Sequence, residues 1–481
     1  MATISSPGIG SGLDVNSIVT QLVAIERQPI NDLQTQASAL QTKLSAFGKV
    51  QSYLSTLRDA AAALTSPSTW NQTTGTSSDA TSVAVTTDAN NRPGSYSVQV
   101  TQLAQAQTNI SKTYASADDL VGEGTLHIEL GTWGTGNTFA ANPAATAVDI
   151  SVGPPAKSLA QVRDMINAAN AGITATVLSD ASGARLVFTS STTGAANGFR
   201  ITVADSDGGN VDTSGLSALA FDPSVGTVTM SQALAAANAS ALINGAPVSS
   251  ATNTLTNVVD GMTLQLQRVT TSPVQITTAS DKDAIQQKIQ DFVKAYNDIN
   301  NELATDTKYD ADTKTAGTLQ GDSAAVSLRY ALRNMLGGTS AASTAFTRLA
   351  DIGFDVQRDG TISVNSTKLD NALANLGELK KLFSNTDTVT PANNGFATLF
   401  RQFGDQALGV DGALSARTDG IRQSISRNED RQAELEVRVS QTEDRLRKQY
   451  TALDAQMGQL QSLSTYVTQQ LTILSNNSGS K

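Results

Sequence analysis

Two side-chain types common in catalytic sites are scarce in this sequence, which has one histidine and no cysteine. The single histidine, His127, would have to serve any Ser-His-Asp arrangement, and the G-x-S-x-G turn that presents a reactive serine does not occur. His127 stands between the apolar residues Leu126 and Ile128, so we expect it on the polar face of a β-strand, turned to solvent. The chain contains no cysteine, which excludes disulfide scaffolds, thiolate zinc sites and cysteine nucleophiles.

Two acidic turns resemble calcium loops in part. An EF-hand needs glycine at position 6 and glutamate at position 12, but counted from Asp310 these positions are Thr315 and Gly321. The pair Asp205 and Asp207 fails for the same reason. We therefore expect polar turns at both places and no metal site.

The remaining motifs have ordinary structural interpretations. Gly8, Gly10 and Gly12 follow no strand and precede no acidic ribose partner, so they are not a dinucleotide-binding loop. No pair of carboxylates stands out as a general acid and base. Aromatic residues form only 5% of the chain, and we expect three that could stack on a sugar to be core or loop anchors instead: Trp70, Trp133 and Phe139. The sequence thus predicts no enzyme and no cofactor.

Length and charge restrict the fold and its partners. With 481 residues, the chain is long enough for two to four domains of about 100–200 residues each. The net charge of -10 and a pI of about 4.7 disfavour nucleic acid and anionic membrane surfaces as partners. No stretch approaches a membrane-spanning run of apolar residues, and no basic residue precedes Arg27. We therefore expect neither a membrane span nor a cleaved secretory signal.

The N-terminal part has the pattern of two successive helices. Asp14 or Asn16 can cap the first, Pro29 interrupts it and can occupy the first turn of the second, and Thr65 ends the second. After the proline, apolar residues recur every seven residues, which is typical of a coiled-coil seam. The apolar positions are Ile18, Leu22 and Ile25, then Leu33, Leu40, Phe47, Leu54 and Ala61.

The C-terminal part repeats this pattern between Ile421 and Leu474, with charges of both signs between the seam positions as far as Lys448. Several seam positions are polar, so the seam should associate weakly and specify register: Asn428, Gln432, Thr442 and Gln449. We expect the two ends of the chain to pair, and an ordinary bundle helix is the alternative. The expected facing residues, within one chain or on a neighbour, are Leu33, Leu40, Phe47 and Leu54 against Leu453, Leu460, Val467 and Leu474.

The middle of the chain, about residues 76–275, shows the alternation of short antiparallel strands, for example at Val83 and Val85. One helix is expected inside it, capped by Ser158, with an apolar face over residues 159–166.

Helices return after about residue 280. Asp322 or Ser323 can cap one of them, Asp359-Gly360 can supply a two-residue type I′ turn for a hairpin, and Ser366 can cap the helix that follows. The pattern predicts an α+β multidomain protein. Long terminal coiled-coil helices and a helical bundle with one β-hairpin carry inserted β-rich head domains.

The sequence resembles the family of flagellar filament cap proteins, also called hook-associated protein 2, over nearly its whole length. The N-terminal match is carried by Ser11-Gly12-Leu13-Asp14-Val15, Ile18-Val19, Leu22-Val23 and Ile25-Glu26-Arg27-Gln28-Pro29-Ile30. The C-terminal match is carried by Gly321-Asp322-Ser323, Asp351-Ile352-Gly353-Phe354, Asp359-Gly360 and Leu382-Phe383-Ser384. A stretch from Leu159 to Ala175, continued by Arg185 to Ser190, is similar to a motif of flagellins and hook-associated proteins.

The resemblance implies a structural cap at the distal tip of the bacterial flagellar filament, which promotes flagellin folding and polymerisation, prevents loss of subunits and is required for motility. It implies export by the flagellar type III apparatus without a cleaved signal peptide. The implied partners are other copies in a homo-oligomer, often a pentamer, together with flagellin, the hook-associated junction proteins and an export chaperone at the C-terminal helix. Some family members bind mucin or act as adhesins.

The resemblance and the patterns together imply four domains. The expected ranges are 1–42 with 440–481 for a terminal leg, 43–75 with 276–439 for a helical bundle, 76–120 with 231–275 for a β-rich domain, and 121–230 for an inserted β-rich domain. The expected oligomer or filament contacts are Leu13, Ile18, Leu22, Leu33, Leu40, Phe47, Leu54, Leu446, Leu453, Leu460, Val467, Leu471 and Leu474.

Three other functions remain open at this point. A surface adhesin could bind mucin or other glycans through the acidic β-rich head, and a secreted glycosidase would need a carboxylate pair that the sequence does not indicate. A hook-filament junction protein or flagellin itself is the structural alternative, against which the Asp359-Gly360 hairpin and the helix after it argue.

Overall fold

The computed structural model describes residues 14–478, so the predicted contact Leu13 lies outside the described residues. The chain divides into two compact units, one built from the chain up to Ser66 and from Gln286 onward, the other from Pro67–Ile285.

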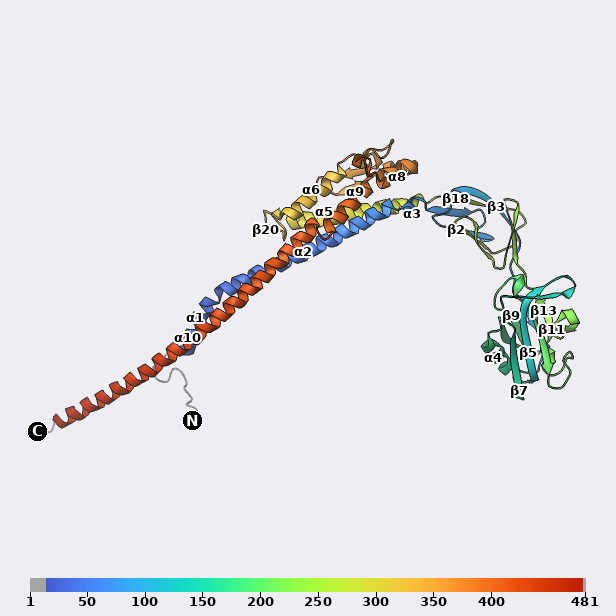
Figure 1. Cartoon of the computed structure of the whole chain (residues 1–481), viewed down its shortest axis with the longest axis horizontal. Helices are drawn as coiled ribbons and strands as arrows, with labels where there is room; N and C mark the ends of the chain where they lie inside the picture. Colours follow the sequence, from blue (N-terminus) through green and yellow to red (C-terminus); the bar gives the residue numbers. More distant parts are fainter. Residues whose placement is uncertain (1–13, 479–481) are drawn as a thin grey trace. The chain divides into compact units, whose positions relative to one another are not determined.

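The first unit is mainly helical (Figure 1). Its helices are α1 (Val15–Glu26), α2 (Gln28–Thr65), α5 (Lys282–Thr307), α6 (Ser323–Leu336), α7 (Ser366–Leu373), α8 (Leu376–Ser384), α9 (Phe396–Leu408) and α10 (Ala413–Ser478). Two short hairpins accompany them: β19 (Tyr309–Asp310) with β20 (Thr315–Ala316), and β21 (Phe354–Val356) with β22 (Ile362–Val364). The sequence predicts only the second hairpin, because strands of two residues leave no detectable alternation.

Aromatic side chains fill the core of this unit. The ring of Phe400 on α9 lies edge-on to Phe292 and Tyr296 of α5, with centroids 5.2 and 6.1 Å apart. On α2, Phe47 and Leu54 are 0% and 1% exposed. The long helices therefore gain their stability from tertiary packing rather than from helix propensity alone.

The helix ends confirm most of the predicted caps. Asp14 caps α1, Pro29 lies in the first turn of α2, and Asp322 caps α6 by accepting from the amides of the first turn. The cap of α7 is Asn365 rather than Ser366, because the Asn365 side chain accepts from the Lys368 amide at 3.1 Å.

The predicted two-residue turn of the β21–β22 hairpin is wrong. The Gln357 amide donates to the Thr361 carbonyl at 2.8 Å, so the connection has three residues. Only Gly360 of that loop has positive φ, at 91°, whereas a type I′ turn needs two such residues. The Asp359 carboxylate instead accepts from the Thr361 amide and stabilises the loop.

The second unit contains two β-rich domains in succession along the chain. We call the domain whose strands come before and after the insertion in the sequence the outer domain. It has a five-stranded sheet in the order β1-β18-β3-β14-β15 and a three-stranded sheet in the order β16-β17-β2, which enclose one hydrophobic core. The elements are α3 (Pro67–Trp70), β1 (Thr73–Ser77), β2 (Val83–Thr87), β3 (Gly94–Gln102), β14 (Ala239–Ile243), β15 (Ala246–Ser250), β16 (Thr254–Val259), β17 (Met262–Leu266) and β18 (Val274–Ser280).

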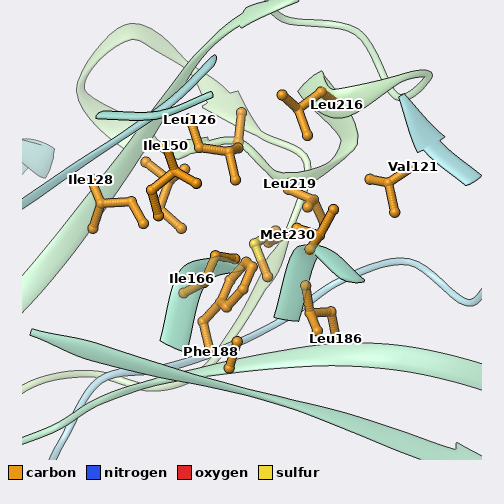
Figure 2. Packing of buried hydrophobic residues seen from close by; sticks show 14 of the residues in the cluster. Val121, Leu126, Ile128, Ile150, Ile166, Leu186, Phe188, Leu216, Leu219 and Met230 are labelled. Atoms are coloured by element: carbon orange, nitrogen blue, oxygen red, sulfur yellow. The ribbon is translucent and has the colours of Figure 1, made fainter. Parts of the chain in front are cut away.

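The inserted domain also has two sheets, and α4 packs beside β7 and β8. Residues from β5, β7, β9 and α4 meet in one core, where Leu126, Ile150, Phe188 and Ile166 point toward one another (Figure 2). The elements are β4 (Thr108–Ile110), β5 (Leu120–Trp133), β6 (Phe139–Ala141), β7 (Val148–Ser158), α4 (Leu159–Ala169), β8 (Ile173–Asp180), β9 (Gly183–Ser190), β10 (Gly198–Asp205), β11 (Phe221–Asp222), β12 (Thr227–Val228) and β13 (Ser231–Leu234).

Ser158 caps α4 as the sequence predicts, in a reciprocal capping box with Gln161. The strand β4 pairs with β13 on one side and with β9 on the other. Residues 108–110 and 231–234 therefore lie with the inserted domain rather than with the outer one. An antiparallel bridge between Gln105 and Ala237 joins the two crossing segments. The α+β multidomain class with terminal helices and β-rich insertions is confirmed.

Candidate functional site

The apolar face of α1 packs against α10. Val15, Val19 and Val23 are buried together with Val439, and Leu446 is partly buried against them. The predicted stripe at Ile18, Leu22 and Ile25 is wrong in detail: Ile18 is half-buried, Leu22 is 37% exposed and Ile25 is 62% exposed. Both stripes are apolar and lie side by side on one short helix, so only the register with α10 decides which of them is buried.

Two polar contacts define that register. Arg27 pairs with Glu436 at 3.1 Å, and Arg447 donates to the side-chain oxygen of Asn16 at 3.1 Å. Residue numbers fall by 11 on α1 while they rise by 11 on α10, so the two helices are antiparallel. Since the described part of α1 begins beside residue 449 or so, α10 runs on well beyond its pairing with α1 (Figure 1).

The rest of α10 exposes a row of large apolar side chains. We call Ala413–Tyr450 the proximal segment of α10 and Leu453–Ser478 its distal segment. The most exposed members of the row, at 60% or above, are Leu460, Leu471 and Leu474. The other exposed apolar residues of the distal segment are Leu453, Met457, Leu463, Tyr466, Val467 and Ile473.

The distal segment is also nearly uncharged. Its only charged residue is Asp454, and its other polar residues are chiefly Gln, Ser, Thr and Asn. A contiguous apolar row of this length on a helix surface is typical of a protein interaction site. Because charge is scarce, a partner would be held mainly by apolar burial and not by ion pairs.

The structure separates the predicted contact residues into two groups. Phe47 and Leu54 are buried in the helical unit, and Leu33 and Leu40 are half-buried on α2. The prediction that these four face Leu453, Leu460, Val467 and Leu474 within one chain is wrong, because the antiparallel register ends before the distal segment. Pairing with a neighbouring chain stays a prediction.

Several residues of the α1–α10 contact are not among the predicted contacts. Val15, Val19 and Val439 are buried there, and Leu435 and Tyr450 pack against them. The spacing of Val15, Val19 and Val23 is also that of one helix face and could have predicted the contact. The neighbouring stripe at Ile18, Leu22 and Ile25 fits a helical period equally well, so the sequence does not decide between the two.

His127 and the two tryptophans have structural partners or are buried. His127 Nδ1 lies 2.6 Å from Asp149 Oδ1 across the paired strands β5 and β7, on an exposed face. Trp133 donates its indole N–H to the Phe199 carbonyl, and its ring packs against Phe139 and Phe221. Trp70 is buried, at 6% exposure.

The acidic turns are satisfied by their own chain. The Thr313 amide hydrogen bond lowers the pKa of Asp310. Asp205 accepts from the Ser217 amide, and Asp207 accepts from the Gly209 amide, each at 2.8 Å. Among residues 14–478, no group of three or more acidic, histidine or cysteine side chains is arranged to hold a metal ion. No helix within the same range combines the length and apolar character needed to cross a bilayer.

Comparison with known proteins identifies relatives over the whole chain. The family model described as Flagellar hook-associated protein 2 N-terminus matches residues 11–107, and the model described as Flagellar hook-associated protein 2 C-terminus matches residues 236–462. Flagellar hook-associated protein 2 of Escherichia coli (strain K12) is 31% identical over 493 residues, covering 100% of both chains. A-type flagellar hook-associated protein 2 of Pseudomonas aeruginosa is 30% identical over 485 residues and covers 97% of each chain.

A solved structure is similar as well. The crystal structure of the flagellar cap protein FliD D1-D2-D3 domains from Escherichia coli aligns with a TM-score of 0.60 at 29% identity. The alignment covers 78% of this chain and 99% of that one. The inserted domain, residues 108–235, falls between the two family-model matches.

Proposed function

The chain belongs to the flagellar hook-associated protein 2 family, and from this premise we propose that it caps the distal tip of a bacterial flagellar filament. Two comparisons support the proposal. The chain is similar over its full length to flagellar hook-associated proteins 2, and its fold is similar to the crystal structure of the flagellar cap protein FliD from Escherichia coli. In this role the protein retains newly exported flagellin at the tip, promotes its folding and addition, and is needed for filament elongation.

One structural observation carries the proposal of how it works: the exposed apolar row of the distal segment. The segment from Leu453 to Ser478 is about 39 Å long at 1.5 Å per residue. Each leucine that passes from about 60% exposed, as at Leu460, to buried gains on the order of 1–2 kcal/mol. A contact made of several side chains, each contributing a free energy of this size, can release and form again in steps as the filament grows.

We propose that the distal segment is a leg that docks on flagellin or on a neighbouring copy of the chain. The contact residues are proposed to be Leu446, Leu453, Leu460, Val467, Leu471 and Leu474, with Leu13, Ile18, Leu22, Leu33 and Leu40 completing the surface on the partner helix. Phe47 and Leu54 would act indirectly, because they hold α2 in the helical core.

The test uses a double substitution, Leu460→Asp with Val467→Asp. Two charges on the apolar row should prevent docking, so filaments should stay short and flagellin should accumulate in the medium. Both side chains are about half exposed or more, so the variant should fold with an unchanged thermal midpoint. Normal elongation without loss of flagellin would exclude the leg mechanism.

The matched control is Gln461→Asp with Thr468→Asp. These residues have the same spacing and are exposed on the same segment, one position further along the helix. The control adds the same charge beside the row rather than on it. Normal filaments in the control and short filaments in the test variant would assign the effect to the apolar row.

The finer features of assembly follow from the same family premise. We propose export through the flagellar type III apparatus, a homo-oligomeric ring that is most often a pentamer, and neighbouring hook-associated junction proteins. An export chaperone would cover the apolar row before secretion. Deletion of residues 440–481 tests this partner, because unchanged export and unchanged chaperone binding would both contradict it.

Glycan or mucin binding is not favoured by a specific feature of the head. The indole N–H of Trp133 is already engaged by the Phe199 carbonyl, and the Trp133 ring packs on Phe139 and Phe221. A sugar platform needs an aromatic face and a free polar group, and this cluster uses both internally.

A further inference from the structure

Two arginines on α6 lie one turn apart at a cavity of the helical unit. Arg329 and Arg333 line a cavity of about 230 Å³ together with Thr307, Val326 and Tyr330. The cavity lies beside the C-terminal end of α5, away from the apolar row of the distal segment. Two like charges at this spacing on a helix repel each other unless an anion lies between them.

Among the described residues, neither arginine forms an ion pair with a carboxylate within 4 Å, although the charge of Arg333 helps to lower the pKa of Asp359, after the loop's own hydrogen bonds from Thr361. Arg333 makes one long hydrogen bond, from Nη2 to the Arg358 carbonyl at 3.5 Å. The Nε–H of Arg329 is buried and has no acceptor among the described residues. Two other half-buried arginines are neutralised, Arg200 by Glu129 at 2.7 Å and Arg417 by Asp322 at 2.6 Å. Arg401 is a third case, in which a buried Nε–H also has no acceptor among the described residues.

A second buried donor without a partner lies within electrostatic range of these arginines. Tyr296 of α5 is 0% exposed, and its hydroxyl has no hydrogen-bond partner among the described residues. Burial raises the pKa of Tyr296 to about 12, while the nearby charges of Arg333 and Arg329 act to lower it. The phenol therefore keeps its proton at neutral pH and remains a donor close to both guanidinium groups.

The hairpin loop holds one arginine in position. A Cβ at Gly360 would lie 3.1 Å from Arg333 Nε and 2.9 Å from Asn300 Oδ1, so the loop backbone closes tightly over both side chains. Asn300 in turn donates to the Asp359 carbonyl at 3.3 Å. Arg333 is thus packed against a fixed surface rather than extended into solvent, which lowers the entropy lost on binding.

We propose that this cavity is an oxyanion-binding site, in which Arg329 and Arg333 together hold one carboxylate or phosphate group. A guanidinium donates two parallel hydrogen bonds to such a group, and the unpaired Nε–H of Arg329 supplies one of these donors. The anion can come from inorganic phosphate or from an acidic side chain of a second copy, which is plentiful because Asp and Glu outnumber Lys and Arg by 43 to 33.

A simpler explanation is that the C-terminal end of α5 alone attracts the two cations. The partial negative charge of a helix C-terminus favours nearby arginines. It would place them there without creating any site for an anion, and the experiment below distinguishes the two cases.

The test compares the full chain with the variant Arg329→Gln plus Arg333→Gln. In the first measurement, inorganic phosphate is titrated calorimetrically at low ionic strength. The intact chain should bind phosphate saturably, and the variant should bind at least tenfold more weakly. Equal phosphate binding by both proteins would overturn the proposal.

The second measurement follows self-association by sedimentation velocity in phosphate-free buffer. If a second copy supplies the carboxylate, the variant should associate at least tenfold more weakly, and phosphate should compete with association of the intact chain. Phosphate binding without any change in association identifies the free ion as the ligand. No phosphate binding together with unchanged association would overturn the proposal.

The control variant is Arg92→Gln plus Arg268→Gln, which removes the same charge from two exposed arginines of the β-rich unit. It should behave like the intact chain in both measurements. The cavity variant should fold, with a thermal midpoint that is unchanged or raised, because it relieves repulsion between two unpaired cations. The single variant Arg329→Lys keeps the charge but loses the bidentate geometry. Its phosphate affinity should lie between that of the intact chain and that of the double variant Arg329→Gln plus Arg333→Gln.

Discussion

The proximal and distal segments of α10 have the same helical conformation and nearly the same spacing of apolar residues, yet they have opposite environments. In the proximal segment, Val439 is 3% exposed beneath α1, and charged residues of both signs cover the outer face. In the distal segment, Leu460 is 60% exposed and Asp454 is the only charged residue. One helix therefore contains a completed intrachain contact and, directly after it, an apolar surface without a partner among the described residues.

This difference shows that a heptad pattern alone does not identify a buried seam. The proximal segment combines an apolar stripe with ion pairs that fix register, such as Arg27 with Glu436. The distal segment has the stripe without such pairs, as expected for the proposed docking by apolar burial. In α10, charge distribution separates the buried part of the helix from the exposed part more clearly than apolar spacing does.

The largest expected effect comes from substituting members of the two groups of predicted contacts. Phe47→Ala should lower the free energy of unfolding by about 3–5 kcal/mol, because a fully buried aromatic side chain leaves a cavity. Leu460→Ala should change it by about 0.5 kcal/mol or less, since that side chain is mostly exposed. Urea denaturation measures both, and similar costs at the two sites would contradict the division of the predicted contacts into a buried and an exposed group.

The next effect concerns the start of the proximal segment. Arg417 donates through Nε and Nη2 to Asp322 Oδ2, at 2.9 and 2.6 Å, and the Asp322 side chain is 3% exposed. Arg417→Ala should lower the free energy of unfolding by about 1–3 kcal/mol, because it leaves a buried carboxylate without its charged partner. The matched control is Arg422→Ala, whose partner Asp419 is exposed. Equal costs in the two variants would show that burial of Asp322 is unimportant.

Acid should destabilise the helical core, where Glu378 has a lowered pKa. Hydrogen bonds from Lys381, Ser343 and Thr344 lower the pKa of Glu378 to about 2 from an ordinary value near 4.5. A carboxyl group with a lowered pKa in the folded state stabilises the fold above its ordinary pKa, and this contribution is lost as the pH falls from about 4.5 to 2. Thermal unfolding of Glu378→Gln should therefore differ from that of the intact chain at pH 6 and converge with it near pH 2. A difference that persists at pH 2 would contradict this assignment.

The smallest effect is expected at the α1–α10 ion pair. Arg27 and Glu436 are about half exposed, so Arg27→Gln should weaken the docking of α1 by only about 0.2–1 kcal/mol. Salt should remove this difference, whereas association through the nearly uncharged distal segment should be insensitive to salt. Hydrogen exchange of the α1 amides at low and high ionic strength measures the first effect. Strongly salt-dependent association of the distal segment would mean that apolar burial is not its main source of affinity.

Much of the local structure could be predicted because it depends on neighbouring residues. The cap at Asp14, the proline in the first turn of α2 and the capping box at Ser158 all rest on contacts within one helical turn. The prediction of a two-residue turn is wrong for the three-residue loop 358–360, since several hairpin turns accept the same Asp-Gly pair.

The amino-acid sequence by itself determined where the long helices and the β-rich middle lie, several helix caps and which family the chain resembles, because periodicity and motifs are local properties. Only the tertiary structure decided which apolar stripe of α1 is buried, where the pairing with α10 ends, and that Arg329 and Arg333 line one cavity with a buried Nε–H left without an acceptor among the described residues. These outcomes depend on register and on contacts between residues far apart in the chain. A shift of one helical turn would have exchanged buried for exposed residues without altering the local pattern.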